Sequence, residues 1–348
     1  MTLYPKHMIR LVATAAMVVL AASCSRDNIE MGSRISLSAN LTSQTRSIIA
    51  SADAMKYDGA AFGVYGYKNF NNLDQLIFNN VKVYYSTDDW TYTPKKFWDR
   101  NAYYHYIAYW PYSDEDVSND NSTHTLTISG IPNWQENGPD ARDVMIAYSQ
   151  MSAQNYLNTN GGEVRFTFDH MLSQIIIRAW YFGNEFKKPY ITGLTVGSDA
   201  KPVAKSDGTT DISRKYSDST FDPSYSGPTL SGSKTLLTNA SGDAVEQYFD
   251  TEEEGKASTL RTTMCTWLAM PYGDEAKKDI PIKIFYKLGQ DGVEHSFESS
   301  VPLGFLTAGS TYVTTLKFDT SGDVINLEAI IVKHWITGQE IDNEVYNW

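Results

Sequence analysis

Cysteine is scarce in this chain, which has 348 residues and only two cysteines, Cys24 and Cys265. So few cysteines exclude the disulfide framework that stabilises many small secreted domains, and stability has to come from packing. Cys265 lies in an apolar, strand-like run at residues 263–268, where a cysteine serves as a small buried hydrophobe. The alternative role, a reactive thiol, lacks an adjacent His or Lys in the sequence.

Motifs of catalysis and of metal or cofactor binding are also missing. The sequence contains no G-x-S-x-G elbow, no P-loop and no G-x-G-x-x-G, and its six His residues form no H-x-x-x-H pair. Carboxylates are numerous but scattered, so no sequence pattern indicates the catalytic pair of carboxylates that a glycosidase needs. These absences predict a protein that is not an enzyme and that needs no metal or cofactor.

One acidic loop is the remaining candidate for a metal site. Residues 114–120 carry four carboxylates, on Asp114, Glu115, Asp116 and Asp120. The loop lacks the spacing and the glycine of an EF-hand. A solvated loop is the favoured interpretation, and calcium binding is the alternative.

Long helical patterns are absent, and the net charge of −12 disfavours nucleic acids and anionic lipid surfaces as partners. The sequence has 23 Tyr, 14 Phe and 8 Trp in short apolar runs separated by Gly, Asn, Asp and Ser, which is typical of strands joined by turns. This pattern predicts an all-β fold of antiparallel sandwiches.

The first 30 residues have the anatomy of a secretory signal peptide. Lys6 and Arg10 are basic, residues 11–20 are apolar, and small residues at 21–23 precede Cys24. The apolar run is too short to span a bilayer. A cysteine after small residues resembles the lipobox of bacterial lipoproteins, although the leucine expected three residues before it is displaced to Leu20. The resemblance implies cleavage before Cys24 and a lipid on Cys24; the alternative is an ordinary secreted protein.

Residues 35–42 alternate strictly between apolar and polar side chains. Ile35, Leu37, Ala39 and Leu41 share one face, which predicts a half-buried strand. The polar stretch 43–47 that follows contains Arg46 and is expected to be exposed.

The predicted division of the chain follows these features. A signal peptide covers residues 1–23, a pro-segment with the first strand 24–46, and two β-sandwich domains 47–162 and 163–348, with the seam at Gly161-Gly162. Residues 197–259, rich in Ser, Thr, Gly, Asp and Lys, are expected to form loops or weak hairpins. Trp98, Tyr106, Trp110 and Trp267 are expected in the cores.

Six passages along the chain form a distinctive set: KFW at 96–98, YYHYIAYWP at 103–111, DVMIA at 143–147, FDHMLSQI at 168–175, LTAGSTY at 306–312 and KHW with TG at 333–338. His170 lies in one of them, and it is interpreted as a structural histidine because no nucleophile or second ligand accompanies it. These passages resemble those of fimbrillin-like proteins, occur in that family's order and cover most of the chain.

The resemblance implies a fold, a location and a mechanism. The fold is two transthyretin-like antiparallel β-sandwiches in tandem, and the role is in type V pili of Bacteroidetes-type bacteria or in related surface adhesins. Lipidated precursors reach the outer surface, where an Arg-specific protease removes the N-terminal strand, and a neighbouring subunit's strand fills the groove. In this chain residues 35–42 match that strand and Arg46 matches the cut. Arg34 precedes the strand, so cutting there would leave the groove filled.

The sequence leaves two candidates for the segment that is donated to a neighbouring subunit. Ile325, Leu327, Ala329 and Ile331 repeat the alternation of the first strand. The alternative is that residues 325–332 are the last strand of the second domain, which leaves the poorly alternating tail 336–348. The rival function is a non-polymerising surface module that binds a glycan or a host protein through exposed aromatic residues.

Overall fold

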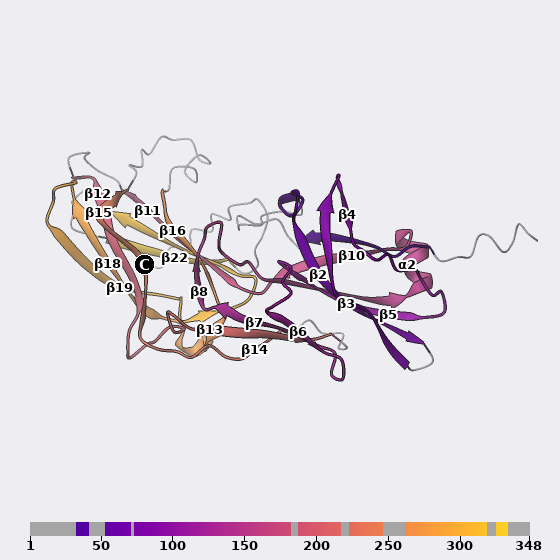
Figure 1. Ribbon diagram of the computed structural model, residues 1–348. Helices are drawn as coiled ribbons and strands as arrows, with labels where there is room; N and C mark the ends of the chain where they lie inside the picture. The colour runs from indigo at the N-terminus through magenta and orange to yellow at the C-terminus, as the bar shows by residue number, and fades with distance from the viewer. Residues whose placement is uncertain are drawn as a thin grey trace, which may run out of the picture.

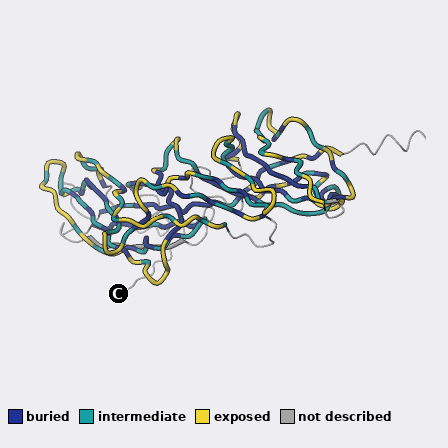
Figure 2. The backbone as a smooth tube through the Cα atoms, turned by 60° about the horizontal axis from the view of Figure 1, so that its bottom comes forward, coloured by how far each residue is buried: buried dark blue, intermediate teal, exposed yellow. Residues whose placement is uncertain are grey.

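The computed structural model describes residues 33–41, 53–70, 73–181, 187–216, 223–245, 262–318 and 325–332. In these ranges the chain is built almost entirely of β-strands arranged in an elongated molecule (Figure 1). The prediction of an all-β fold is confirmed. Buried residues lie along the chain at both ends of the molecule (Figure 2). None of the helices in the described ranges is long and apolar enough to cross a membrane.

A seven-stranded sheet forms one end of the molecule and packs on the first hydrophobic core, which includes Phe62, Trp98 and Phe166. Its neighbours pair antiparallel, except that β1 and β10 run parallel. Parallel neighbours need a long connection between them. Here that connection contains the other five strands of the sheet, which lie between β1 and β10 in the sequence. The order of strands is β1 (Ser36–Leu41), β10 (Glu163–His170), β9 (Met145–Ser152), β5 (Tyr103–Trp110), β2 (Ala61–Phe70), β3 (Leu73–Ser86) and β4 (Asp89–Thr91).

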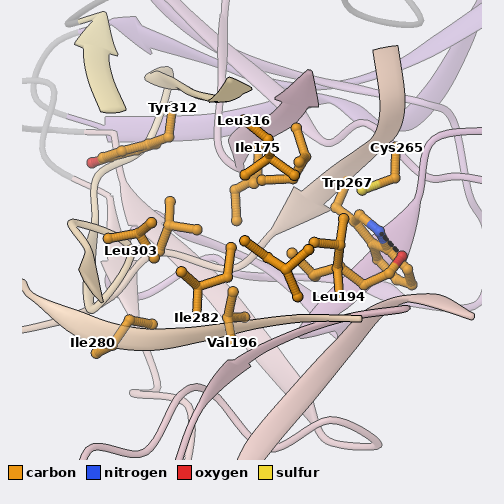
Figure 3. Close-up of a cluster of buried hydrophobic side chains, with 14 of the residues drawn as sticks. Ile175, Leu194, Val196, Cys265, Trp267, Ile280, Ile282, Leu303, Tyr312 and Leu316 are labelled. Atoms are coloured by element: carbon orange, nitrogen blue, oxygen red, sulfur yellow. Dashed lines mark hydrogen bonds between the residues drawn. The ribbon is translucent and has the colours of Figure 1, made fainter. Parts of the chain in front are cut away.

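The other end is a sandwich of two sheets around one hydrophobic core, called the second core below and shown in Figure 3. Ile175, Leu194, Trp267, Ile282 and Leu316 meet there. The first sheet has the order β22 (Ile325–Val332), β21 (Thr311–Phe318), β11 (Ser173–Tyr181), β16 (Thr262–Ala269) and β8 (Trp134–Glu136). The second has the order β15 (Ser233–Ala244), β12 (Pro189–Gly197), β18 (Ile280–Leu288) and β19 (Glu294–Val301).

The expected antiparallel pairing also has a second exception, because β11 and β21 are parallel. A short hairpin-like pair, β17 (Tyr272–Gly273) and β20 (Phe305–Leu306), completes this end of the molecule. Sequence alternation identifies the faces of strands, but it does not determine which strands become neighbours.

A four-stranded sheet joins the two ends. Its order is β14 (Ser224–Tyr225), β13 (Thr209–Lys215), β7 (Thr125–Pro132) and β6 (Val117–Asp120). Strand β7 comes from the predicted first domain and β13 from the predicted second, in a region expected to form loops or weak hairpins. They pack on the seven-stranded sheet through a third core that includes Tyr67, Ile107, Ile128, Ile146 and Ile212.

The predicted seam at Gly161-Gly162 does not separate the sheets. Strand β10, which follows it, belongs to the seven-stranded sheet, and the chain enters the sandwich after His170. Gly161 instead ends a helix, α2 (Ala153–Asn160), and its φ of 64° is the left-handed value that glycine adopts readily. Ser152 caps the start of α2 by accepting a hydrogen bond from the Asn155 backbone N–H.

The aromatic residues expected in the cores are buried. The exposed fraction of Trp98, Tyr106, Trp110 and Trp267 is 9% or less. Trp98 stacks on Tyr156 with ring centroids 4.9 Å apart, and Tyr106 packs edge-on against Phe78 at 5.6 Å. Edge-on and offset aromatic pairs add about 0.5–1.5 kcal/mol beyond area burial.

Candidate functional site

Strand β1 lies at the edge of the seven-stranded sheet, with its apolar face buried. Ile35 is fully buried, Leu37 is 3% exposed, and Ala39 and Leu41 are each 8% exposed. Ser36 and Asn40, on the other face, are exposed. This is the half-buried strand that the alternation predicts.

The hydrogen-bonding partner of β1 is β10. All six residues of β1 pair with residues 163–168 in a parallel register, from Ser36 opposite Glu163 to Leu41 opposite Phe168. Strand β10 pairs with β9 at Asp169 and His170. Most of β10 therefore has β1 as its ladder partner, so β1 supports β10 as well as covering the core.

Large aromatic side chains form the core beneath β1. Phe62 packs on Trp90, Phe166 and Phe168, with ring centroids 4.9, 5.8 and 5.6 Å apart. Ala39 lies opposite Phe166 in the ladder, so the smallest apolar residue of β1 is paired with a fully buried ring. The face of β1 thus presents two large residues, one small residue and one large residue in that order.

Residues 33–35, which lead into β1, are held by residues 92–98. The Ile35 N–H donates to the Lys96 carbonyl at 2.9 Å, and the Trp98 N–H donates to the Ser33 carbonyl at 3.0 Å. Arg34 and Phe97 form an isolated antiparallel bridge. The Tyr92 hydroxyl donates to the Ile35 carbonyl at 2.7 Å, and its burial raises the pKa of Tyr92.

Two of the predicted site residues lie outside the described residues. These are Cys24, the expected lipidation site, and Arg46, the expected cleavage site. Arg34 lies two residues before the start of β1, so a cut there would leave β1 in its groove. Ile35, Leu37, Ala39 and Leu41 come together on one buried face, as their spacing indicates.

The candidate donor strand has a place of its own in the fold. Strand β22 pairs antiparallel with β21 along all eight of its residues and forms an edge of the five-stranded sheet. This agrees with the interpretation that residues 325–332 are the last strand of the second half. The alternative donor, the tail at 336–348, lies outside the described residues.

His170 and Cys265, the two residues considered for a chemical role, are buried inside the protein. His170 Nδ1 lies 2.9 Å from Asp143 Oδ1, and both side chains are buried. This pair connects the end of β10 to the segment before β9. Cys265 is buried, and desolvation raises the pKa of its thiol to about 12, so the reactive thiolate is disfavoured at neutral pH.

Carboxylates of the acidic loop 114–120 accept hydrogen bonds from residues outside the loop. Asp116 accepts a hydrogen bond from Arg142 at 3.1 Å. The Ser122 hydroxyl and backbone N–H and the Thr123 hydroxyl donate to Asp120, which lowers its pKa to about 2. Among the residues that the structure describes, no group of three or more His, Cys, Asp or Glu side chains is placed to hold a metal ion.

Sequence reasoning did not identify two parts of this site. The strand β4 (Asp89–Thr91) and Tyr92 were not expected, because three residues are too short to show an alternation. The second part is the parallel pairing of β10 with β1, which joins residues more than a hundred positions apart. The proline and aromatic content of residues 90–98 was the available sign of a special segment.

The model of the fimbrillin-like family matches residues 45–335, most of the chain. The chain therefore belongs to the fimbrillin-like family. No curated protein matches it. The match begins after β1 and extends past β22.

Solved structures share the fold at low sequence identity. A fimbrial protein from Bacteroides vulgatus is 17% identical, with a TM-score of 0.53, over 87% of this chain and 99% of that one. A candidate cell adhesion protein from Bacteroides ovatus is 14% identical, with a TM-score of 0.50, over 89% of this chain and all of that one. At these identities the likeness establishes the fold alone.

Proposed function

We propose that this chain is a structural subunit of a surface fimbrium that assembles by donor-strand exchange. The precursor is cut after Arg46, β1 leaves its groove, and a strand of a neighbouring copy takes its place. The observation that carries this proposal is the edge position of β1 together with the burial of its three apolar side chains and of Ile35 just before it. Edge strands with free backbone groups are the usual sites of strand addition.

The groove favours replacement of β1 over an empty state. Without β1, residues 163–168 of β10 lose their ladder partner, and the ring cluster around Phe62 and Phe166 becomes exposed to water. Unpaired backbone groups and exposed rings both cost free energy, so an incoming strand that restores them is strongly favoured.

The segment 325–331 has the sequence that the groove requires. Ile325, Leu327, Ala329 and Ile331 repeat the large, large, small, large order of β1, including the alanine at the third position. In the uncut chain this segment is strand β22, paired with β21 alone, and it has to leave that sheet before it is donated. The same order in two distant segments supports residues 325–331 as the donor.

Cutting the purified chain tests polymerisation directly. The mature protein, from residue 24 onwards, is treated with an Arg-specific protease, and particle size is followed by chromatography and electron microscopy. Fibres or ladders are expected from the cut protein, while the uncut protein stays monomeric. A cut protein that remains a stable monomer would contradict the proposal and favour the alternative, a surface module that binds a glycan or a host protein.

The proposed location is the outer membrane, with the precursor anchored through a lipid on Cys24 and the mature subunit in the fimbrium. The apolar run at 11–20 and the small residues before Cys24 support this. Family membership supports a place at the cell surface, with other fimbrial subunits as partners.

Replacing the cysteine tests the anchor. The variant Cys24→Ala is expected to lose membrane association, because no acyl chain is attached, and to appear uncleaved or soluble on fractionation. Cys265→Ala is the matched control, since that thiol is buried in the second core, and it should fractionate like the wild type. Membrane fractionation of Cys24→Ala identical to that of the wild type would exclude the lipid anchor.

A further inference from the structure

The segment of residues 92–98 forms hydrogen bonds with the backbone just before β1. Three hydrogen bonds join the two: Ile35 N–H to Lys96 carbonyl, Trp98 N–H to Ser33 carbonyl, and Tyr92 hydroxyl to Ile35 carbonyl. All three involve Ser33 or Ile35, which precede Ser36, the first residue of β1. The approach to β1 is therefore held by the segment 92–98, and β1 itself pairs with β10.

The Tyr92 hydroxyl is fixed in position. The side chain is 2% exposed, its ring lies 5.4 Å from that of Phe78, and the Lys95 ammonium group lies 4.6 Å from the ring centroid. The hydroxyl donates to the Ile35 carbonyl and accepts from the Lys96 N–H at 3.2 Å. One buried group thus connects β1 with the segment that borders it.

We infer that Tyr92 and residues 96–98 form a register clamp for whichever strand occupies the β1 groove. The inference rests on the proposed strand exchange for its second occupant. The three hydrogen bonds of the clamp go to backbone atoms, so they accept different sequences but fix the direction of the strand and the position of its first apolar residue. A strand shifted by one residue would direct its apolar side chains away from the core.

The clamp restricts which segments can enter. The occupant needs two extended residues before its first apolar anchor, to take the places of Ser33 and Arg34. It cannot have proline at that anchor, because the N–H of Ile35 donates a hydrogen bond there. In a second copy of this chain, Asp323 and Val324 precede Ile325, so the segment 323–331 has two residues before its anchor and no proline at it.

The clamp is tested by removing one oxygen atom. Tyr92→Phe retains the ring but leaves the Ile35 carbonyl and the Lys96 N–H without the hydroxyl. The matched control is Tyr272→Phe, because the buried Tyr272 hydroxyl donates to the Leu303 carbonyl, also at 2.7 Å, in the second core. Hydrogen exchange of the Ile35 and Trp98 amides is measured in the uncut chain of each variant.

Protection of these two amides is expected to fall about tenfold in Tyr92→Phe, since a buried polar partner is removed, and to be unchanged in Tyr272→Phe. In the cut protein, a labelled 33–41 peptide should dissociate about tenfold faster from Tyr92→Phe than from Tyr272→Phe. A 35–41 peptide, which lacks Ser33 and Arg34, should dissociate faster than the 33–41 peptide from the wild type.

The two sets of measurements separate the clamp from the exchange. If both variants retain wild-type protection at Ile35 and Trp98 in the uncut chain, the clamp is overturned whatever happens after cleavage. If Tyr92→Phe loses protection but the cut protein never takes up a donor peptide, the clamp holds for β1 and the proposed exchange fails. If the peptides 33–41 and 35–41 dissociate from the cut protein at equal rates, residues 96–98 have no part in the clamp.

Discussion

A chain that begins at residue 47 is expected to lose the structure of its first core. Burial of Ile35, Leu37 and Leu41 is worth about 1.5–3 kcal/mol each, roughly 5–9 kcal/mol together before entropy costs. A typical domain has a net stability of about 5–15 kcal/mol. The burial free energy lost with β1 is therefore comparable with the net stability of the whole domain. Thermal unfolding should show an early transition for the tryptophans Trp90, Trp98 and Trp110, and a later one for the second core.

Point variants extend this test to a chain that still folds. Leu37→Ala is expected to lower the free energy of unfolding by about 2–5 kcal/mol, because it leaves a cavity in the core. Ser36→Ala, one residue earlier on the exposed face, should change it by about 0.5 kcal/mol or less. A synthetic 33–41 peptide added to the shortened chain should remove the early transition, because it restores the packing of the first core. Equal stability of the two point variants would contradict the packing role of β1.

The variant Arg46→Ala is expected to abolish assembly in cells. An uncut β1 stays tethered beside its groove at an effective concentration on the order of millimolar, which a strand of another copy cannot match. The matched control is Arg34→Ala, because Arg34 precedes β1 and cutting there cannot release it. Surface fimbriae are counted by electron microscopy, and the uncut precursor is detected by its size.

Two results would contradict this assignment of the cut. One is an Arg46→Ala strain that assembles fimbriae like the wild type. The other is an Arg34→Ala strain that loses fimbriae although its precursor is still cut after Arg46.

Local features of the fold could be predicted from the sequence, and long-range features could not. The strict alternation at 35–42 identified β1 and its buried face, since the period of two is set within a single strand. Its partner β10 depends on contacts across more than a hundred residues, so sequence pattern could not indicate the parallel register.

Gly161-Gly162, where the seam is predicted, also shows what a local pattern can indicate. Gly161-Gly162 resembled a flexible junction, but Gly161 ends α2 in the left-handed conformation and the Gly162 carbonyl accepts a hydrogen bond from the Trp98 indole N–H at 3.0 Å. The pairing of β7 with β13 joins the regions assigned to different domains. Glycine indicates a backbone requirement at its own position, and it does not indicate whether a sheet ends there.

Incorporation of a donor peptide is the most direct test of strand exchange. A fluorescent peptide of residues 323–332 is mixed with the mature chain, either intact or cut after Arg46, and bound peptide is followed by anisotropy over days. The account predicts uptake by the cut chain alone, and loss of uptake when the peptide carries Ala329→Leu, because the third position faces the buried ring of Phe166. Equal uptake by intact and cut chains, or no uptake by either, would contradict it.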